Sequence, residues 1–111
     1  MTLGIYCAGS LGKEIYDLAV RINEIEKRWE KIIFVDDVCE EKTFYGAEVH
    51  RLSECQTGRG NIEFIIATGT PRSRKKIYDR LMEQSCQLAQ LIDPTAVISP
   101  SASIGAGVIV R

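Results

Sequence analysis

The carboxyl-terminal part of the sequence repeats in units of six residues. Each unit opens with isoleucine, and alanine or valine stands at its fifth position; the units are Ile92–Val97, Ile98–Ser103 and Ile104–Ile109. Such a repeat is typical of a hexapeptide β-helix. The branched residue fills the interior of a triangular coil, the small residue fits its crowded corner, and three units make one turn. Residues 92–111 are therefore predicted to form the first coil of a β-helix.

One coil of this kind leaves both of its edges open. Solenoids are stabilised by stacked neighbouring coils, so a single coil is not expected to stand alone. We therefore expect the chain to be the amino-terminal piece of a longer protein whose repeats continue after Arg111. The alternative is an extended tail in which the period of six is accidental.

Apolar runs alternate with amphipathic stretches before the repeat. Two helices are predicted by apolar residues at spacings of three and four, from Lys13 to near Trp29 and from Pro71 to near Gln84. Crossovers of this length give a parallel sheet covered by helices. Residues 1–91 are thus predicted to be an α/β domain with a Rossmann-like parallel sheet. The predicted strands are Leu3–Cys7, Lys31–Val35, Glu63–Thr68 and Gln87–Ile92.

The boundaries of the second helix are the clearest. Thr70 can cap its first turn, and Pro71 suits the first helical position, where no backbone N–H is needed. The segment 38–60 is the least regular, with a short edge strand in Tyr45–His50 and one helical turn in Arg51–Cys55. The predicted apolar stripe of the second helix consists of Ile77, Tyr78, Leu81 and Met82.

Composition excludes several classes of function. The net charge is −1, so the chain as a whole does not attract nucleic acid or an anionic membrane electrostatically. No apolar run is long enough to cross a bilayer. None of the 4 cysteines forms a C-x₂-C pair, and the single histidine, His50, lies no nearer than five residues to any of them, so no metal site is predicted. Scattered thiols without a secretory signal indicate the cytoplasm.

Three loops carry candidate binding residues, and the first follows the first strand. Gly9, Ser10, Leu11, Gly12 and Lys13 lead into a helix, whose free N–H groups and positive dipole end can hold a phosphate. Cys7 occupies the first glycine position of the dinucleotide fingerprint, which weakens that signal. The alternative is a tight turn whose glycines allow close packing.

The other two loops follow the second and third strands. Asp36 and Asp37 end the second strand, where an acid accepts hydrogen bonds from ribose hydroxyls or a base N–H; a solvated or capping turn is the alternative. Thr68, Gly69 and Thr70 follow the third strand and can close the same crevice, or simply cap a helix. The basic run 72–76 either attracts an anion or forms a solvated helix face.

Together these segments resemble a known family. The stretches Y-C-A-G-S-L-G-K, F-V-D-D, F-I-I-A-T-G-T-P-R-S-R-K-K-I-Y and L-I-D-P-T-A-V-I-S-P-S-A-S-I-G are similar, in order and spacing, to the bacterial sugar O-acyltransferase family. This family includes sialic acid O-acetyltransferases and UDP-4-amino-sugar N-acetyltransferases. The resemblance implies a Rossmann-like nucleotide-sugar-binding domain, then a left-handed β-helix that binds acetyl-CoA, forms trimers and supplies a histidine base.

The resemblance also assigns residues. It implies that Gly9, Ser10 and Gly12 line the sugar-nucleotide pocket, that Asp36 and Asp37 contact the nucleoside, and that 68–70 close the pocket. The first loop departs from the family pattern, because Cys7, Ser10 and Leu11 stand where glycine, glycine and histidine are common. A side chain at position 10 narrows the approach to a phosphate, which predicts a different ligand or weaker binding.

The leading hypothesis is an acceptor-binding domain of an acyl-CoA-dependent sugar acetyltransferase, with a UDP-sugar or related nucleotide-sugar as its partner. No catalytic residue is assigned within the chain, and we expect it alone to transfer no acetyl group. The parent protein would use acetyl-CoA as co-substrate at a site outside this chain and would assemble as a homotrimer. The alternatives are a non-catalytic ligand-binding module and, disfavoured by the missing first glycine, an NAD-dependent oxidoreductase.

Overall fold

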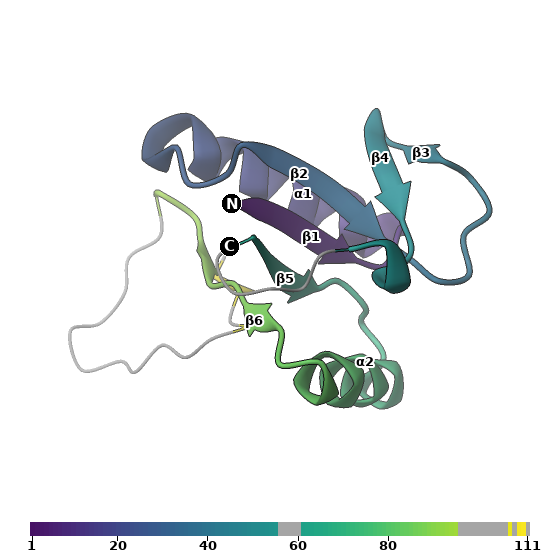
Figure 1. Cartoon of the computed structure of the whole chain (residues 1–111). Coiled ribbons are helices and arrows are strands. Elements are labelled where there is room, and N and C mark those ends of the chain that lie inside the picture. The colour runs from purple at the N-terminus through teal and green to yellow at the C-terminus, as the bar shows by residue number, and fades with distance from the viewer. Residues whose placement is uncertain (56–60, 96–106, 108, 111) are drawn as a thin grey trace, which may run out of the picture.

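A mixed, mostly parallel sheet forms the centre of the molecule (Figure 1). The computed structural model describes residues 1–55, 61–95, 107, 109 and 110. The six-stranded sheet has the order β3-β4-β2-β1-β5-β6, in which only β3 runs antiparallel to its neighbour, β4. The elements are β1 (Thr2–Tyr6), α1 (Ser10–Glu26), β2 (Lys31–Val35), β3 (Thr43–Phe44), β4 (Ala47–His50), the 3₁₀ turn η1 (Leu52–Glu54), β5 (Ile62–Ile66), α2 (Pro71–Glu83) and β6 (Gln87–Leu88).

Side chains alternate between the two faces of the central strands. Leu3, Ile5 and Phe34 pack on the face covered by α1, with Ile15, Leu18 and Ile22 of that helix. Val35, Phe64 and Ile66 lie on the opposite face, which is covered by Leu52 of η1 and Leu81 of α2. Because residues two apart share a face, both faces of the apolar strands are buried, as a parallel sheet requires. The predicted Rossmann-like arrangement is confirmed at this level.

Two predictions about the second half of the domain are wrong. The segment Gln87–Ile92 is not one strand, because β6 ends at Leu88 and a separate strand, β7 (Leu91–Ile92), joins another sheet. Tyr78 and Met82 are 45% and 38% exposed, so they do not complete the apolar stripe of α2. The helix packs over β5 and the two-residue edge strand β6, a narrow surface that fully buries only Leu81.

Part of the hexapeptide segment is described. Leu91 pairs in parallel with Ile109, and Ile92 with Val110, so β7 and β8 (Ile109–Val110) lie side by side three hexads apart in sequence. Residues 96–106, 108 and 111 of the predicted coil lie outside the described residues.

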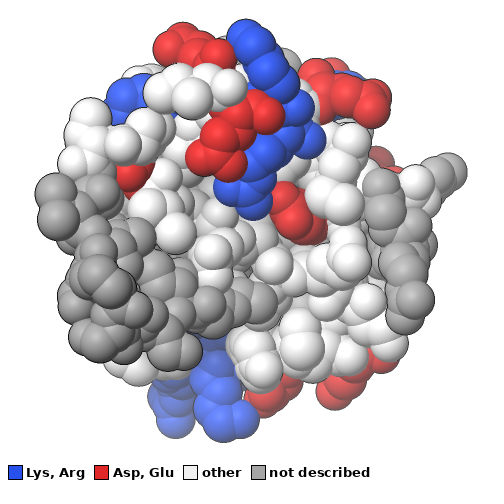
Figure 2. Space-filling model, turned by 90° about the vertical axis from the view of Figure 1, so that its left-hand side faces the viewer, with Lys and Arg blue, Asp and Glu red and all other residues white. Residues whose placement is uncertain are grey.

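Charged side chains of both signs lie together at the amino ends of the strands (Figure 2). Arg28 contacts Glu63 at 3.2 Å and Glu26 at 3.8 Å, and its guanidinium stacks 4.4 Å above the Trp29 ring. Trp29, which follows the end of α1, is buried, and its indole N–H donates to Glu63. Within the described part of the chain, neither helix combines the length and apolar character needed to cross a bilayer.

Candidate functional site

A cleft of about 310 Å³ opens where the carboxyl ends of β1, β2 and β5 meet α2. Three of the predicted binding residues, Asp36, Asp37 and Thr68, lie in its wall. Asp36 and Asp37 follow β2 and Thr68 follows β5, the strands on either side of β1, and the parallel topology brings these strand ends to one edge of the sheet. The remaining lining residues are Tyr6, Cys7, Val38 and, from α2, Ser73, Lys76, Ile77 and Arg80.

A second cavity, of about 460 Å³, lies on the other side of Thr68. Leu11 and Gly69 line it, so two more predicted residues border the same edge of the sheet. It extends to the hexapeptide segment through Gly107 and Ile109. Thr68 is shared by both cavities, which makes them neighbours along the ends of the strands.

The other predicted residues occupy positions around these cavities. Gly9 is the N-cap of α1, and Ser10 is its exposed first residue. The Lys13 ammonium lies 5.5 Å from the centre of the Phe44 ring, toward β3. Thr70 is the N-cap of α2, as predicted, with Pro71 at the first position, but its side chain makes no capping hydrogen bond.

The glycines of these loops differ in their surroundings. A Cβ on Gly12 would lie 2.5 Å from the Cys7 carbonyl oxygen, so close packing of α1 on the turn explains this glycine. A Cβ on Gly9 or Gly69 would meet nothing within 4 Å. A ligand can therefore reach the backbone at Gly9 and Gly69, whereas the space beside Gly12 is filled by the Cys7 backbone.

Cys7 adopts a backbone conformation that suits glycine. Its φ is 101°, where a Cβ is strained, and it stands at the position where the resembled family commonly has glycine. Burial, together with the nearby Asp36 and Asp37 carboxylates, raises the pKa of its thiol to about 11. The thiol is therefore protonated at neutral pH and is a poor nucleophile.

Cys7→Gly is expected to be more stable than Cys7→Ala. Both variants lose the thiol, but only glycine relieves the strain of the positive φ, which costs about 1–3 kcal/mol for other residues. We expect the Cys7→Gly midpoint in urea unfolding to exceed that of Cys7→Ala by an amount equivalent to about 1 kcal/mol. Equal midpoints would show that the backbone at position 7 is not strained.

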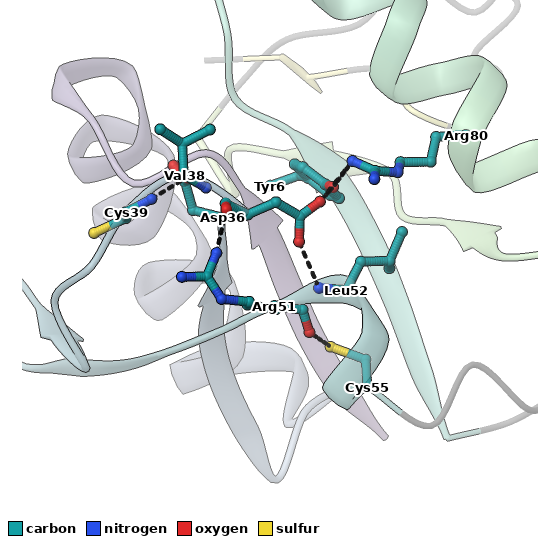
Figure 3. A network of polar contacts seen from close by, with 9 residues as sticks. Tyr6, Asp36, Val38, Cys39, Arg51, Leu52, Cys55 and Arg80 are labelled. Atoms are coloured by element: carbon teal, nitrogen blue, oxygen red, sulfur yellow. Dashed lines mark hydrogen bonds and ion pairs between the residues drawn. The ribbon is translucent and has the colours of Figure 1, made fainter.

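Asp36 joins the ends of β1 and β2. One carboxylate oxygen accepts a hydrogen bond from the Ala8 N–H at 2.9 Å. The other accepts from the N–H groups of Val38 and Cys39, at 2.9 and 3.0 Å. Asp36 therefore fixes the turn after β2 against the loop after β1, and Figure 3 labels Val38 and Cys39, its partners in that turn.

Asp37 connects β2 with β1, η1 and α2, and Figure 3 labels its partners Tyr6, Arg51, Leu52 and Arg80. Its carboxylate accepts hydrogen bonds from the Tyr6 hydroxyl at 2.7 Å, the Arg80 guanidinium at 2.6 Å and the Leu52 N–H at 3.0 Å. Its backbone carbonyl accepts from the Arg51 guanidinium. Burial works to raise the pKa of this carboxyl, but the hydrogen bonds and the charges of Arg80 and Arg51 outweigh it and lower the pKa.

Sequence reasoning missed Tyr6 and Arg80 as members of this network. Tyr6 lies in an apolar run and looks like a core residue, while Arg80 is far from the loops along the chain. One pattern in the sequence could have linked Arg80 to the cleft. Residues three and four apart share one helix face, so Arg80 lies on the same face as Ile77 and Ser73, near the start of the helix.

The comparisons with known proteins agree on the family and the fold. Residues 2–81 match the family model of the PglD N-terminal domain. The acetyltransferase domain of PglB from Neisseria gonorrhoeae FA1090 is 28% identical, with a TM-score of 0.80, over 96% of this chain and 51% of that chain. The same domain in complex with acetyl coenzyme A gives the same TM-score and identity over 96% of this chain and 50% of that chain.

PerB from Caulobacter crescentus, in complex with CoA and GDP-perosamine, shares the fold. It is 21% identical, with a TM-score of 0.76, over 99% of this chain and 51% of that chain. The chain therefore spans about half the length of these solved structures. No curated protein sequence matches it.

Proposed function

Because the chain belongs to the PglD N-terminal domain family, we propose that it is the acceptor-binding domain of a sugar acetyltransferase. It binds a nucleotide-sugar, such as a UDP-sugar, in the cleft formed by Asp36, Asp37, Thr68 and α2. The position of this cleft carries the proposal, since ligands of open parallel sheets bind at the carboxyl ends of the strands. The similarity to PerB, whose structure holds GDP-perosamine, supports a nucleotide-sugar ligand.

The glycine turns contribute through their backbone. Gly9 and Gly69 leave room for a ligand, and the first N–H groups of α1 have no partner within the helix. The ligand's path to the backbone at Gly9 is bordered by Ser10, Leu11 and Lys13. Gly12 allows α1 to pack closely on the turn that contains Cys7. The nucleoside lies nearer Asp36 and Asp37, whose hydrogen bonds fix the shape of the cleft wall.

The pairing of β7 with β8 supports the start of a left-handed β-helix. Partners separated by three hexads are what one complete triangular coil requires. Arg74 joins this segment to the sheet, donating to the Ile66 carbonyl at 3.3 Å and the Gly107 carbonyl at 3.5 Å. We place further coils, acetyl-CoA and a trimer interface in the part of the protein beyond this chain.

The proposed reaction uses the acceptor-binding domain together with the β-helix. A histidine of the β-helix removes a proton from the sugar hydroxyl or amine, which attacks the acetyl thioester and releases CoA. His50 does not fit this role, because its imidazole is paired with Glu48 at 2.8 Å on β4 and does not line the cleft. We expect this cytoplasmic chain by itself to bind the acceptor without transferring acetyl groups.

Calorimetry with UDP, UDP-sugars, GDP-perosamine and NAD tests the proposal. We expect saturable binding of a nucleotide or nucleotide-sugar and none of NAD, because the first fingerprint glycine is replaced by Cys7. Binding of NAD alone would point to an oxidoreductase. Binding of none of these ligands would contradict the proposal and favour a module that does no acceptor binding.

A further inference from the structure

One face of α2 lines the cleft with polar and basic side chains. Ser73, Lys76 and Arg80 are spaced by three and four residues, so they project from the same side of the helix. All three border the cleft, together with Ile77 between them. The opposite wall consists of Asp36, Asp37 and Val38 at the end of β2.

The charges of the opposite wall are already engaged by the protein. Asp36 accepts three backbone hydrogen bonds, and Asp37 accepts from Tyr6, Leu52 and Arg80. Arg80 meets Asp37 through Nη1, which leaves the other guanidinium N–H groups on its exposed side for a second anion. Among the ion pairs within the described part of the chain, none involves Lys76, whereas its neighbour Lys75 pairs with Asp79 at 2.8 Å.

We propose that the diphosphate of the nucleotide-sugar lies along this face of α2, held by the Lys76 ammonium, the Arg80 guanidinium and the Ser73 hydroxyl. This inference rests on the proposed function and assigns the anionic part of the ligand to side chains of α2. Ammonium and guanidinium groups form strong charge-assisted hydrogen bonds with phosphate oxygens. The assignment also accounts for the first loop, where Cys7, Ser10 and Leu11 offer less backbone access than glycines would.

Binding of a nucleoside and its diphosphate to matched variants tests the assignment. The probe is UDP or GDP, whichever the unmodified chain binds more tightly, with uridine or guanosine for comparison. We expect Lys76→Ala to weaken diphosphate binding about tenfold and to leave nucleoside binding unchanged. Lys75→Ala, which removes the same charge from the adjacent position, is expected to change binding less than about twofold.

The outcomes separate the two proposals. If the unmodified chain binds neither diphosphate, the proposed function fails and this assignment fails with it. If it binds one, but Lys76→Ala binds as tightly as Lys75→Ala, only the assignment to α2 is overturned. An equal loss of nucleoside and diphosphate binding in Lys76→Ala would also overturn the assignment. Lys76→Arg keeps the positive charge and should retain most of the affinity for the diphosphate. Thermal melting shows whether each variant is folded.

Discussion

Gly12→Ala is expected to lower the free energy of unfolding by about 2 kcal/mol or more, the largest loss among the loop glycines. The added Cβ would lie 2.5 Å from the Cys7 carbonyl oxygen and 3.2 Å from the Phe34 ring. A backbone oxygen cannot rotate away, so α1 has to move off the sheet, and overpacking this close to backbone costs about 3 kcal/mol or more, the upper end of the usual range. The gain in helix propensity of about 1 kcal/mol offsets only part of this cost.

Thermal unfolding measures the effect, with Gly69→Ala as the matched control. A loss of 2 kcal/mol corresponds to a fall in the melting temperature of about 10 °C in a domain of this size. Gly69→Ala should change it by no more than a degree or two, since a Cβ there meets nothing within 4 Å. Similar melting temperatures for the two variants would contradict the packing of α1 described above.

Asp37→Asn is expected to lower the free energy of unfolding at pH 7 by about 2 kcal/mol. The carboxylate joins β1, η1 and α2 to the end of β2 through Tyr6, Leu52 and Arg80. Hydrogen bonds to a charged group contribute about 1.5–3 kcal/mol, and partial exposure of Asp37 and Arg80 reduces the share of the ion pair. Chemical denaturation of the two proteins measures the difference.

The difference between the two proteins should depend on pH. The pKa of Asp37 is lowered in the folded chain, so its carboxylate stabilises the fold above the unfolded pKa, near 3.8, and this contribution is lost as the pH falls through the folded pKa. The stabilities of the unmodified chain and Asp37→Asn should therefore converge below about pH 4. Asp79→Asn, at an exposed pair with Lys75, should show little difference at any pH. A gap that persists undiminished at low pH would mean that ionisation of Asp37 is unimportant.

The sequence predicted the central strands and both helices because their apolar patterns are strong. Leu3, Ile5, Phe34 and Ile65 stand in runs that only a doubly covered sheet can bury. The break between β6 and β7 has no local signal. It depends on Ala89, whose N–H donates to Phe64 of the main sheet and whose carbonyl accepts from Gly107 of the hexapeptide segment.

The candidate site was predictable where it follows strand ends. Asp36, Asp37 and Thr68 are brought together by the parallel topology, as the order of elements implies. The contacts that fix them were not predictable, because Tyr6 and Arg80 are distant in sequence and meet only when α2 packs on β1 and β5. Likewise, the positive φ of Cys7 is a property of the folded turn and leaves no mark in the composition.

Titration of the ¹⁵N-labelled chain with UDP or GDP, followed by amide chemical shifts, tests the central claim most directly. The claim is that a nucleotide binds at the carboxyl ends of β1, β2 and β5. We expect saturable shifts centred on the lining residues Cys7, Val38, Thr68 and Lys76. Shifts centred instead on Lys31, Asn61 and Ile62, which line a separate cavity near the amino ends of β2 and β5, would contradict it, as would no shifts at all.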